Sequence, residues 1–298
     1  MSNLLIAVLV LLYTFQSAFA NLYARHYPGK ARYSSAVYSV IYGLLVSIGT
    51  FAFSGFSFHP SKATLILGAV NGAALVAYNT LIIRAASLGP FSVTMIFNLS
   101  GGILIPMLWS VLHDGDTLSV WQIAAIFVML ASFVFLNWED KKERGEGERS
   151  GVSLLFILTI AALGLVNGLY GTLMNTAEKL AGGGENGEMI MVTFAVSTLI
   201  GFLLLLVQAK RETIPAFRLN GKSALFALAA SVSACAAVNL LMHILSLVNV
   251  AVLYTMDNGG VLIVAVLWSA LVLKEKLGKY KIVGLILSIA AVFALSIL

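Results

Sequence analysis

Long apolar runs alternate with short polar segments along the whole chain. Ten of these runs have the length of about 20 residues that an α-helix needs to cross a bilayer. They cover approximately residues 3–23, 33–55, 63–86, 90–112, 118–137, 152–176, 188–208, 223–246, 249–273 and 280–298. The pattern predicts an all-α fold, a polytopic protein of the cell (inner) membrane with ten transmembrane helices.

Composition strengthens this prediction. Hydrophobic residues make up 60% of the chain and charged residues 10%, whereas a soluble domain has roughly 25% charged residues. The net charge of +5 does not indicate nucleic-acid binding, because Lys and Arg in membrane proteins mostly set orientation. The apolar run that begins at Leu4 and the small residues near Ala20 also allow a signal peptide. We favour a retained first helix, since the first three residues carry no basic side chain.

The longest polar segment, Trp138–Ser150, separates the fifth run from the sixth. It predicts two five-helix repeats, 1–137 and 152–298, joined by a charged linker at 138–151. Of the 18 Lys and Arg residues, only Lys62 and Lys179 fall in loops after even-numbered runs. Positive loops face the cytoplasm, so the linker is predicted to be cytoplasmic and both termini outside.

The two halves resemble each other in sequence. When Ser87 is set against Ser246, Asn98 falls opposite Asp257, Gly101 falls opposite Gly260, and an LWS triplet (108–110) falls opposite another (267–269). An odd number of helices per half inverts the second copy in the membrane. Inverted repeats are typical of secondary transporters, which bind substrate near mid-membrane between the halves. The alternative is that duplication only produced a stable helical bundle.

A motif at the end of the ninth run carries a family resemblance. The pattern LWSxLxLxExL consists of Leu267-Trp268-Ser269, Leu271, Leu273, Glu275 and Leu277, and residues 108–118 echo it more weakly. With the ten runs and the repeat, it resembles the drug/metabolite transporter (DMT) superfamily, in particular its EamA-type members. The resemblance implies transport or efflux of metabolites such as amino acids, nucleotide sugars, sugar phosphates or cationic drugs. Small members of the superfamily carry a functional Glu in their first span. Here Gln16 and its counterpart Asn167 replace it, so coupling through that position is not implied.

Narrow polar strips run along six of the ten helices. Lipid cannot satisfy these groups, so they are predicted to face protein or a central cavity, although interhelical packing is an alternative use of any one amide. Asp257 is the candidate coupling residue, because burial favours a protonated carboxyl and the acid can hold a proton or a substrate amino group. The candidate substrate-binding residues are Tyr13, Gln16, Asn71, Tyr78, Asn98, Asn167, Tyr170, Asn239, His243, Tyr254, Asp257 and Asn258.

Two glycine pairs, Gly101-Gly102 and Gly259-Gly260, allow either close helix approach or a local break, and are the candidate hinges. The fifth and tenth runs are almost purely apolar and are predicted to face lipid or to form a homodimer. We expect no cofactor and no metal: the His113–Asp116 segment is predicted to be a turn, and no catalytic motif occurs, so an enzyme is not expected.

The expected function is therefore a secondary active transporter of a small polar or zwitterionic metabolite, working by alternating access, with proton coupling as an added hypothesis. The alternatives are a passive facilitator and a non-transporting membrane scaffold. The expected partners are the small-molecule substrate and the lipid bilayer, with no nucleic acid.

Overall fold

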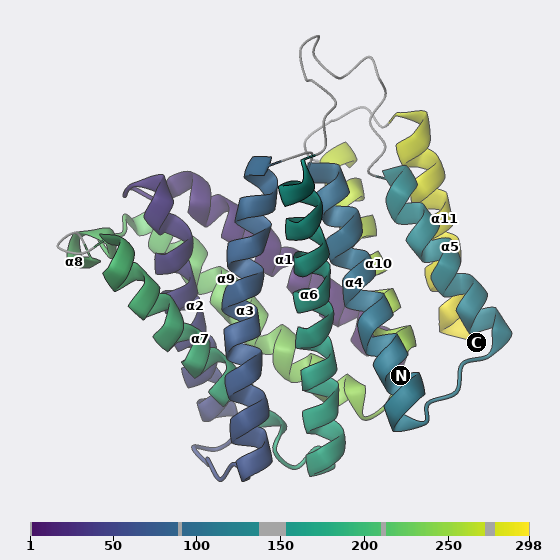
Figure 1. Cartoon of the computed structure of the whole chain (residues 1–298), viewed down its shortest axis with the longest axis horizontal. Helices are drawn as coiled ribbons and strands as arrows, with labels where there is room; N and C mark the ends of the chain where they lie inside the picture. Colours follow the sequence, from purple (N-terminus) through teal and green to yellow (C-terminus); the bar gives the residue numbers. More distant parts are fainter. Residues whose placement is uncertain (1, 89–90, 137–152, 210–212, 272–277, 298) are drawn as a thin grey trace. The chain divides into compact units, whose positions relative to one another are not determined.

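The computed structural model describes residues 2–88, 91–136, 153–209, 213–271 and 278–297. No strand occurs among these residues, so the all-α prediction is confirmed. Ten helices of the described part are long, and each coincides with one predicted run (Figure 1). The predicted linker 138–151 and the end of the LWSxLxLxExL motif, 272–277, lie outside the described residues.

The helix boundaries follow the apolar runs closely. A four-residue helix, α8 (Thr213–Ala216), and a π-helical turn, η1 (Ser110–Asp114), complete the set. The ten long helices are α1 (Ser2–His26), α2 (Ala31–Phe53), α3 (Lys62–Leu88), α4 (Phe91–Trp109), α5 (Val120–Leu136), α6 (Leu154–Ala181), α7 (Asn186–Ala209), α9 (Gly221–Leu245), α10 (Val250–Leu271) and α11 (Lys279–Ile297).

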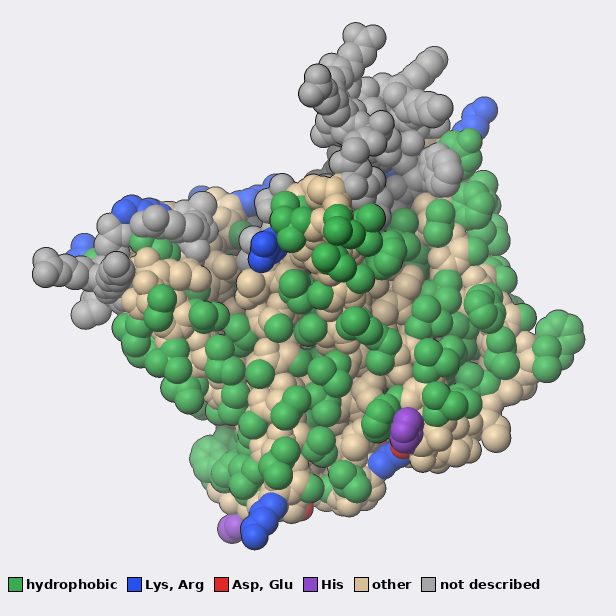
Figure 2. Space-filling view, in the orientation of Figure 1, with side chains coloured by type: hydrophobic (Ala, Val, Ile, Leu, Met, Phe, Trp, Pro, Cys, Tyr) green, Lys and Arg blue, Asp and Glu red, His purple; other side chains and the backbone are tan. Residues whose placement is uncertain are grey.

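Seven helices in the described part are long and apolar enough to cross a membrane: α1, α2, α3, α4 with η1, α6, α7 and α9. Val120–Leu136 and Val250–Val264 are apolar but shorter. Large hydrophobic side chains are exposed along the helix flanks (Figure 2), among them Phe53, Val120 and Phe293. These features are those of a multi-pass membrane protein, because exposed apolar side chains are stable against lipid and not against water.

The chain forms two compact units, and each unit takes segments from both halves of the sequence. Unit 1 comprises Met1–Val10, Thr80–Thr172 and Val248–Leu298. Unit 2 comprises Leu11–Asn79 and Leu173–Leu247. The residues of α1, α3 and α6 are therefore divided between the units.

Unit 1 is built on helix pairs. In it α4 packs against α10, and α5 lies beside α11 (Figure 1). The Ser288 hydroxyl donates to the Ser132 hydroxyl at 2.8 Å, and a Cβ at Gly284 would lie 2.6 Å from the Leu136 nitrogen. The small residues of these two apolar helices thus serve a contact within the chain. A homodimer through them stays a prediction.

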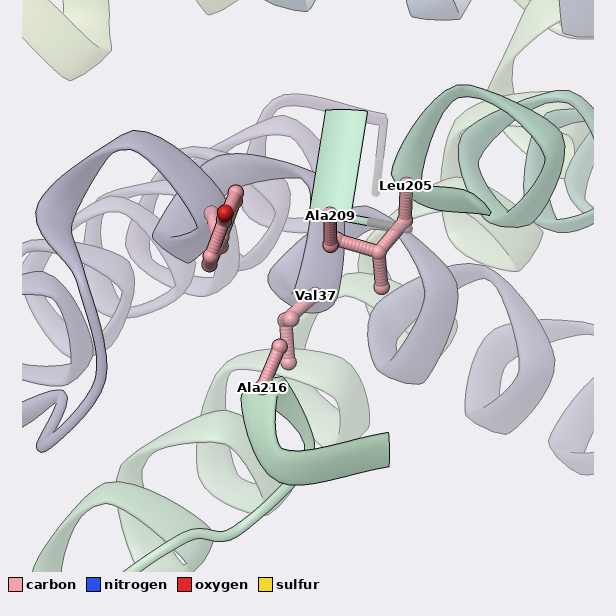
Figure 3. Close-up of a cluster of buried hydrophobic side chains, with 5 residues drawn as sticks. Val37, Leu205, Ala209 and Ala216 are labelled. Atoms are coloured by element: carbon pink, nitrogen blue, oxygen red, sulfur yellow. The ribbon is translucent and has the colours of Figure 1, made fainter. Parts of the chain in front are cut away.

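Unit 2 is built around α2, which packs against α7 and α9. One apolar cluster lies where α2, the end of α7 and α8 meet, and Figure 3 shows Val37, Leu205, Ala209 and Ala216 from it. Glycine allows α3 to approach α7: a Cβ at Gly72 would lie 2.5 Å from the Thr193 carbonyl oxygen. Since no larger residue fits there, the glycine fixes this helix contact.

Candidate functional site

Asp257 lies on α10 in unit 1 and is buried, with 7% of its surface exposed. Its Oδ1 atom has no hydrogen-bond partner among the described residues. The next side chain, Asn258, is satisfied locally, because its Nδ2 donates to the Tyr254 carbonyl at 2.8 Å. A buried carboxylate oxygen without a donor is costly in a protein interior. A proton on Asp257, or a ligand group that donates to it, removes this cost.

Polar side chains of α4 and α6 lie near the same part of α10. Asn167 Nδ2 on α6 donates to the Asn98 carbonyl on α4 at 2.9 Å. A Cβ at Gly102 would lie 2.6 Å from Asn167 Nδ2 and 3.6 Å from Asn258 Nδ2. The Tyr254 hydroxyl on α10 donates to the Gly171 carbonyl on α6 at 3.0 Å. The structure thus brings Asn98, Asn167, Tyr254 and Asn258 together, with Asp257 on the same helix as the last two, and a substrate-binding role for them stays a prediction.

The glycine pairs act by close approach. A Cβ at Gly101 would collide with the backbone of Gly164, which lets α4 and α6 touch. At the second pair, a Cβ at Gly259 would collide with the Met129 side chain, and one at Gly260 would lie 2.6 Å from Val10. Both α4 and α10 continue unbroken through their glycines. Of the two alternatives that the sequence left open, the structure shows close packing and no break, while a hinge role stays a prediction.

Six of the twelve predicted residues belong to unit 2, and their environments differ from one another. Gln16 on α1 donates through Nε2 to the Tyr42 hydroxyl on α2 at 3.0 Å. Its Oε1 and the Tyr38 hydroxyl have no partner among the described residues. Tyr38 and Tyr42 stack at 5.3 Å between ring centroids, and Tyr42 meets Phe194 edge-on at 5.4 Å. The polar strips of the sequence do not include this aromatic column, although the spacing of four between the two tyrosines on one run indicates a shared helix face.

Two amides of unit 2, one half-buried and one fully buried, show opposite situations. Asn239 on α9 donates to the Thr50 hydroxyl at 2.9 Å and to the Cys235 carbonyl at 2.8 Å, so it serves helix packing. Asn71 on α3 is fully buried, and neither atom of its amide has a partner among the described residues. The Thr193 hydroxyl on the adjacent α7 is likewise buried and without a partner there. Asn71, more than Asn239, is the candidate for ligand or water binding in this unit.

The remaining predicted residues are less informative. Tyr13 and Tyr78 are half-buried in unit 2, and Tyr170 is half-buried in unit 1. His243, near the end of α9, is exposed.

The two ends of unit 2 are each closed by a contact between loops of opposite halves of the chain. At one end, Glu185 in the α6–α7 turn accepts from the Ser61 backbone N–H at 2.8 Å, and Glu188 accepts from His59 N–H at 3.4 Å. Hydrogen bonds with Thr64, the largest cause, and with Ser61 hold the pKa of the Glu185 carboxyl below its usual value.

At the other end of unit 2 the contacts are neutral. The Tyr27 hydroxyl, just after α1, donates to the Ala216 carbonyl at 2.7 Å. Asn220 Nδ2 donates to the His26 carbonyl at 2.9 Å. In both cases a loop between the first and second helices of one half binds the segment between the second and third long helices of the other half. Burial raises the pKa of Tyr27 above its ordinary value, so this contact does not titrate near neutral pH.

The His113–Asp116 segment forms a turn, as predicted. It is π-helical, with Gly115 in the left-handed conformation (φ 74°). The buried Ser110 hydroxyl, at the start of η1, donates to Asp116 Oδ2 at 2.7 Å and so closes the turn. Among the described residues, no group of three or more His, Cys, Asp or Glu side chains could hold a metal ion. Ser110 and Asp116 lie six positions apart in the sequence, and Ser269 and Glu275 repeat this spacing. The side chains of the second pair lie outside the described part.

Comparison with known proteins identifies the fold and nothing finer. No family model and no curated protein matches the chain. Among solved structures, 29 chains match. One, described only as a crystal structure of a protein, has a TM-score of 0.71 at 13% identity and covers 99% of this chain and 97% of that one. A likeness at such low identity shows a shared fold over the whole length, and carries no activity with it.

Proposed function

We propose that the chain is a secondary active transporter of a small polar or zwitterionic metabolite, working by alternating access, with Asp257 binding a proton or the amino group of the substrate. The observation that carries the proposal is the buried Asp257 carboxylate, whose Oδ1 has no partner among the described residues. Ionisable groups within membrane helices are rare and mark ion or substrate pathways. A non-enzymatic role and kinship with the DMT superfamily, which rests on the repeated LWSxLxLxExL pattern, belong to the same proposal.

Helix pairing supports an inverted repeat of five plus five helices. α2 packs against α7, α4 against α10, and α5 against α11. In each pair, a helix of the first half meets the helix that holds the same place in the second half. The two end contacts of unit 2 also join a loop of one half of the chain to a segment of the other half. Such symmetry gives one chain two states of similar energy, open to opposite sides.

Two measurements distinguish this proposal from its two rival functions: binding of a ligand, and accumulation of that ligand against its gradient. A scaffold predicts no ligand for the buried polar groups. A facilitator predicts binding and uptake, without accumulation of the substrate against a gradient.

The test begins with thermal unfolding of the purified full-length protein against a library of amino acids and related metabolites. A ligand that binds the folded state raises the unfolding temperature by mass action. We expect at least one zwitterionic compound to do so, and we expect Asp257→Asn to abolish the shift. The matched control is Glu178→Gln, which neutralises an equally buried acid in unit 2. Loss of the shift in both variants, or in neither, contradicts the role of Asp257.

A charge exchange sharpens the same test. Asn98 is the counterpart of Asp257 in the repeat. If a carboxylate at that level of either half is sufficient, Asn98→Asp combined with Asp257→Asn restores the ligand shift. If only the second half can use it, the double variant stays inactive.

A further inference from the structure

One end of unit 2 is strongly basic. The segments 11–40 and 200–245 supply the two loops at this end, and together they contain seven Lys and Arg residues and one acid. The basic residues are Arg25, Lys30, Arg32, Lys210, Arg211, Arg218 and Lys222, and the acid is Glu212, which lies outside the described residues. Figure 2 shows Lys and Arg side chains along the upper left edge, over α8 and the helix ends beside it. One carboxylate cannot neutralise this end.

The end of α1 meets the start of α9 at this place. Asn220 Nδ2, at the N-cap of α9, donates to the His26 carbonyl at 2.9 Å. The His26 ring also lies 5.3 Å from the Phe226 ring, measured between centroids. Arg25, next to His26, therefore lies beside the first turn of α9, which contains Lys222.

Three of these cations are exposed and available to a ligand. The side chains of Arg25, Arg218 and Lys222 have no hydrogen bond or ion pair among the described residues. The N-terminus of a helix carries a partial positive charge and favours acids, yet the first turn of α9 has no acid and contains Lys222. The charge at this end is thus left for an anion from outside the chain.

An exposed apolar face of α9 continues from the basic end. Lys222, Leu225, Leu228 and Val232 share one side of the helix, and the three apolar side chains are 49–61% exposed. The ten residues from Lys222 to Val232 rise about 15 Å, which is half of the roughly 30 Å hydrocarbon core of a bilayer. The face therefore has the length of an acyl chain in one leaflet, with the cations at headgroup level.

We infer that this end of unit 2 binds an anionic phospholipid of the bilayer, with its phosphate at Arg25, Arg218 and Lys222 and one acyl chain along the exposed face of α9. Guanidinium and ammonium groups form strong charge-assisted hydrogen bonds with phosphate oxygens. Anionic lipids attract basic segments that adjoin membrane helices. A zwitterionic lipid gains less, because its own ammonium offsets the phosphate charge. The inference does not rest on Asp257 or on the transport proposal.

The test uses the purified full-length protein in detergent, with dioleoyl phosphatidylglycerol and dioleoyl phosphatidylethanolamine as the probes. Native mass spectrometry measures the fraction of protein that retains each lipid. We expect phosphatidylglycerol to bind about tenfold more tightly, because no ammonium offsets its negative charge. Equal retention of the two lipids, or preference for phosphatidylethanolamine, overturns the inference.

Charge variants locate the headgroup. Arg25→Gln, Arg218→Gln and Lys222→Gln are each expected to lower retention of phosphatidylglycerol about fivefold, the contribution of one cation near an anionic headgroup. The matched control is Lys62→Gln, an exposed lysine in the first turn of α3 at the opposite end of unit 2. A control that loses as much lipid as Lys222→Gln overturns the inference, since general surface charge would then explain the binding.

A second pair of variants locates the acyl chain. Leu225→Gln on α9 is expected to lower retention about fourfold, the equivalent of one buried methylene group. Ile66→Gln is the control, because Ile66 is similarly exposed and lies four residues after Lys62 on α3. Equal effects of the two variants overturn the placement of the chain on α9.

A soluble competitor separates a lipid from a free phosphate compound. A large excess of glycerol phosphate, which has the same phosphate and no acyl chain, is expected to leave phosphatidylglycerol bound. Displacement of the lipid by this compound overturns the inference, because the occupant would then be a soluble phosphate.

Discussion

Two polar side chains, one from each compact unit, are used in different ways. In unit 2, the Asn239 amide on α9 donates to the Thr50 hydroxyl on α2 and to the Cys235 carbonyl on its own helix, so it serves the packing of α2 against α9. In unit 1, Asp257 is more deeply buried than Asn239, yet its Oδ1 has no donor among the described residues. A polar side chain in a membrane helix therefore does not by itself indicate a site. The distinction lies in whether neighbouring helices satisfy it.

The largest effect is expected where glycine sets the distance between helices. A Cβ at Gly101 collides with the Gly164 backbone, which cannot yield as a side chain can. Gly101→Val should therefore destabilise the protein by about 3 kcal/mol or more, at the upper end of overpacking costs. Thermal unfolding and the yield of folded protein measure this.

The matched control is Gly221→Val, because a Cβ at Gly221 would meet open space. A Gly101→Val variant as stable as Gly221→Val would show that α4 and α6 do not rely on this contact.

An intermediate effect separates the two amides of unit 2. Asn71→Leu removes a buried amide that has no partner among the described residues, so we expect the free energy of unfolding to rise by about 1–2 kcal/mol. Asn239→Leu removes bonds that are made, and we expect a loss of about 1 kcal/mol. Chemical denaturation compares both with the wild type.

Function should change in the opposite sense. If Asn71 is kept for a ligand, Asn71→Leu lowers ligand binding while it raises stability, a known trade-off. A destabilised Asn71→Leu variant would instead mean that its amide is satisfied by water and serves packing.

The smallest effect concerns pH at the acidic end of unit 2. The folded protein holds the pKa of Glu185 below its usual value, so this carboxylate stabilises the fold above the pKa of the unfolded chain. The contribution is lost as pH falls through the folded pKa, below about 4.3.

Unfolding temperatures between pH 3 and pH 7 check this prediction. The wild type should fall towards Glu185→Gln at the acidic end of the range, and the two should differ most near neutral pH. Parallel curves across the whole range would exclude a titrating contact. The contact at the opposite end, through Tyr27, gives Tyr27→Phe no such dependence on acid.

The helices could be predicted from the sequence because apolar runs end at polar residues. The run at 63–86 became α3 (Lys62–Leu88), within two residues at each end. The sixth run was placed at 152–176, whereas α6 continues to Ala181. In this last part of α6 Glu178 is buried although it is ionisable, and hydropathy does not anticipate such burial.

The candidate site could be predicted only in part. Burial of Asp257 and the meeting of Asn98 with Asn167 followed from helix periodicity. The different situations of Asn71 and Asn239 did not, because Thr50 lies 189 residues from Asn239. Such a partner is set by tertiary packing, and no local pattern encodes it.

The measurement that tests the central claim most directly is uptake into proteoliposomes. They contain the full-length protein and receive the ligand found by the thermal screen, in radiolabelled form, over a range of external pH. If Asp257 couples transport, the wild type accumulates ligand against its gradient when a proton gradient is imposed, and Asp257→Asn loses both accumulation and pH dependence. Accumulation by Asp257→Asn to the wild-type level, with the same pH dependence, would contradict the account.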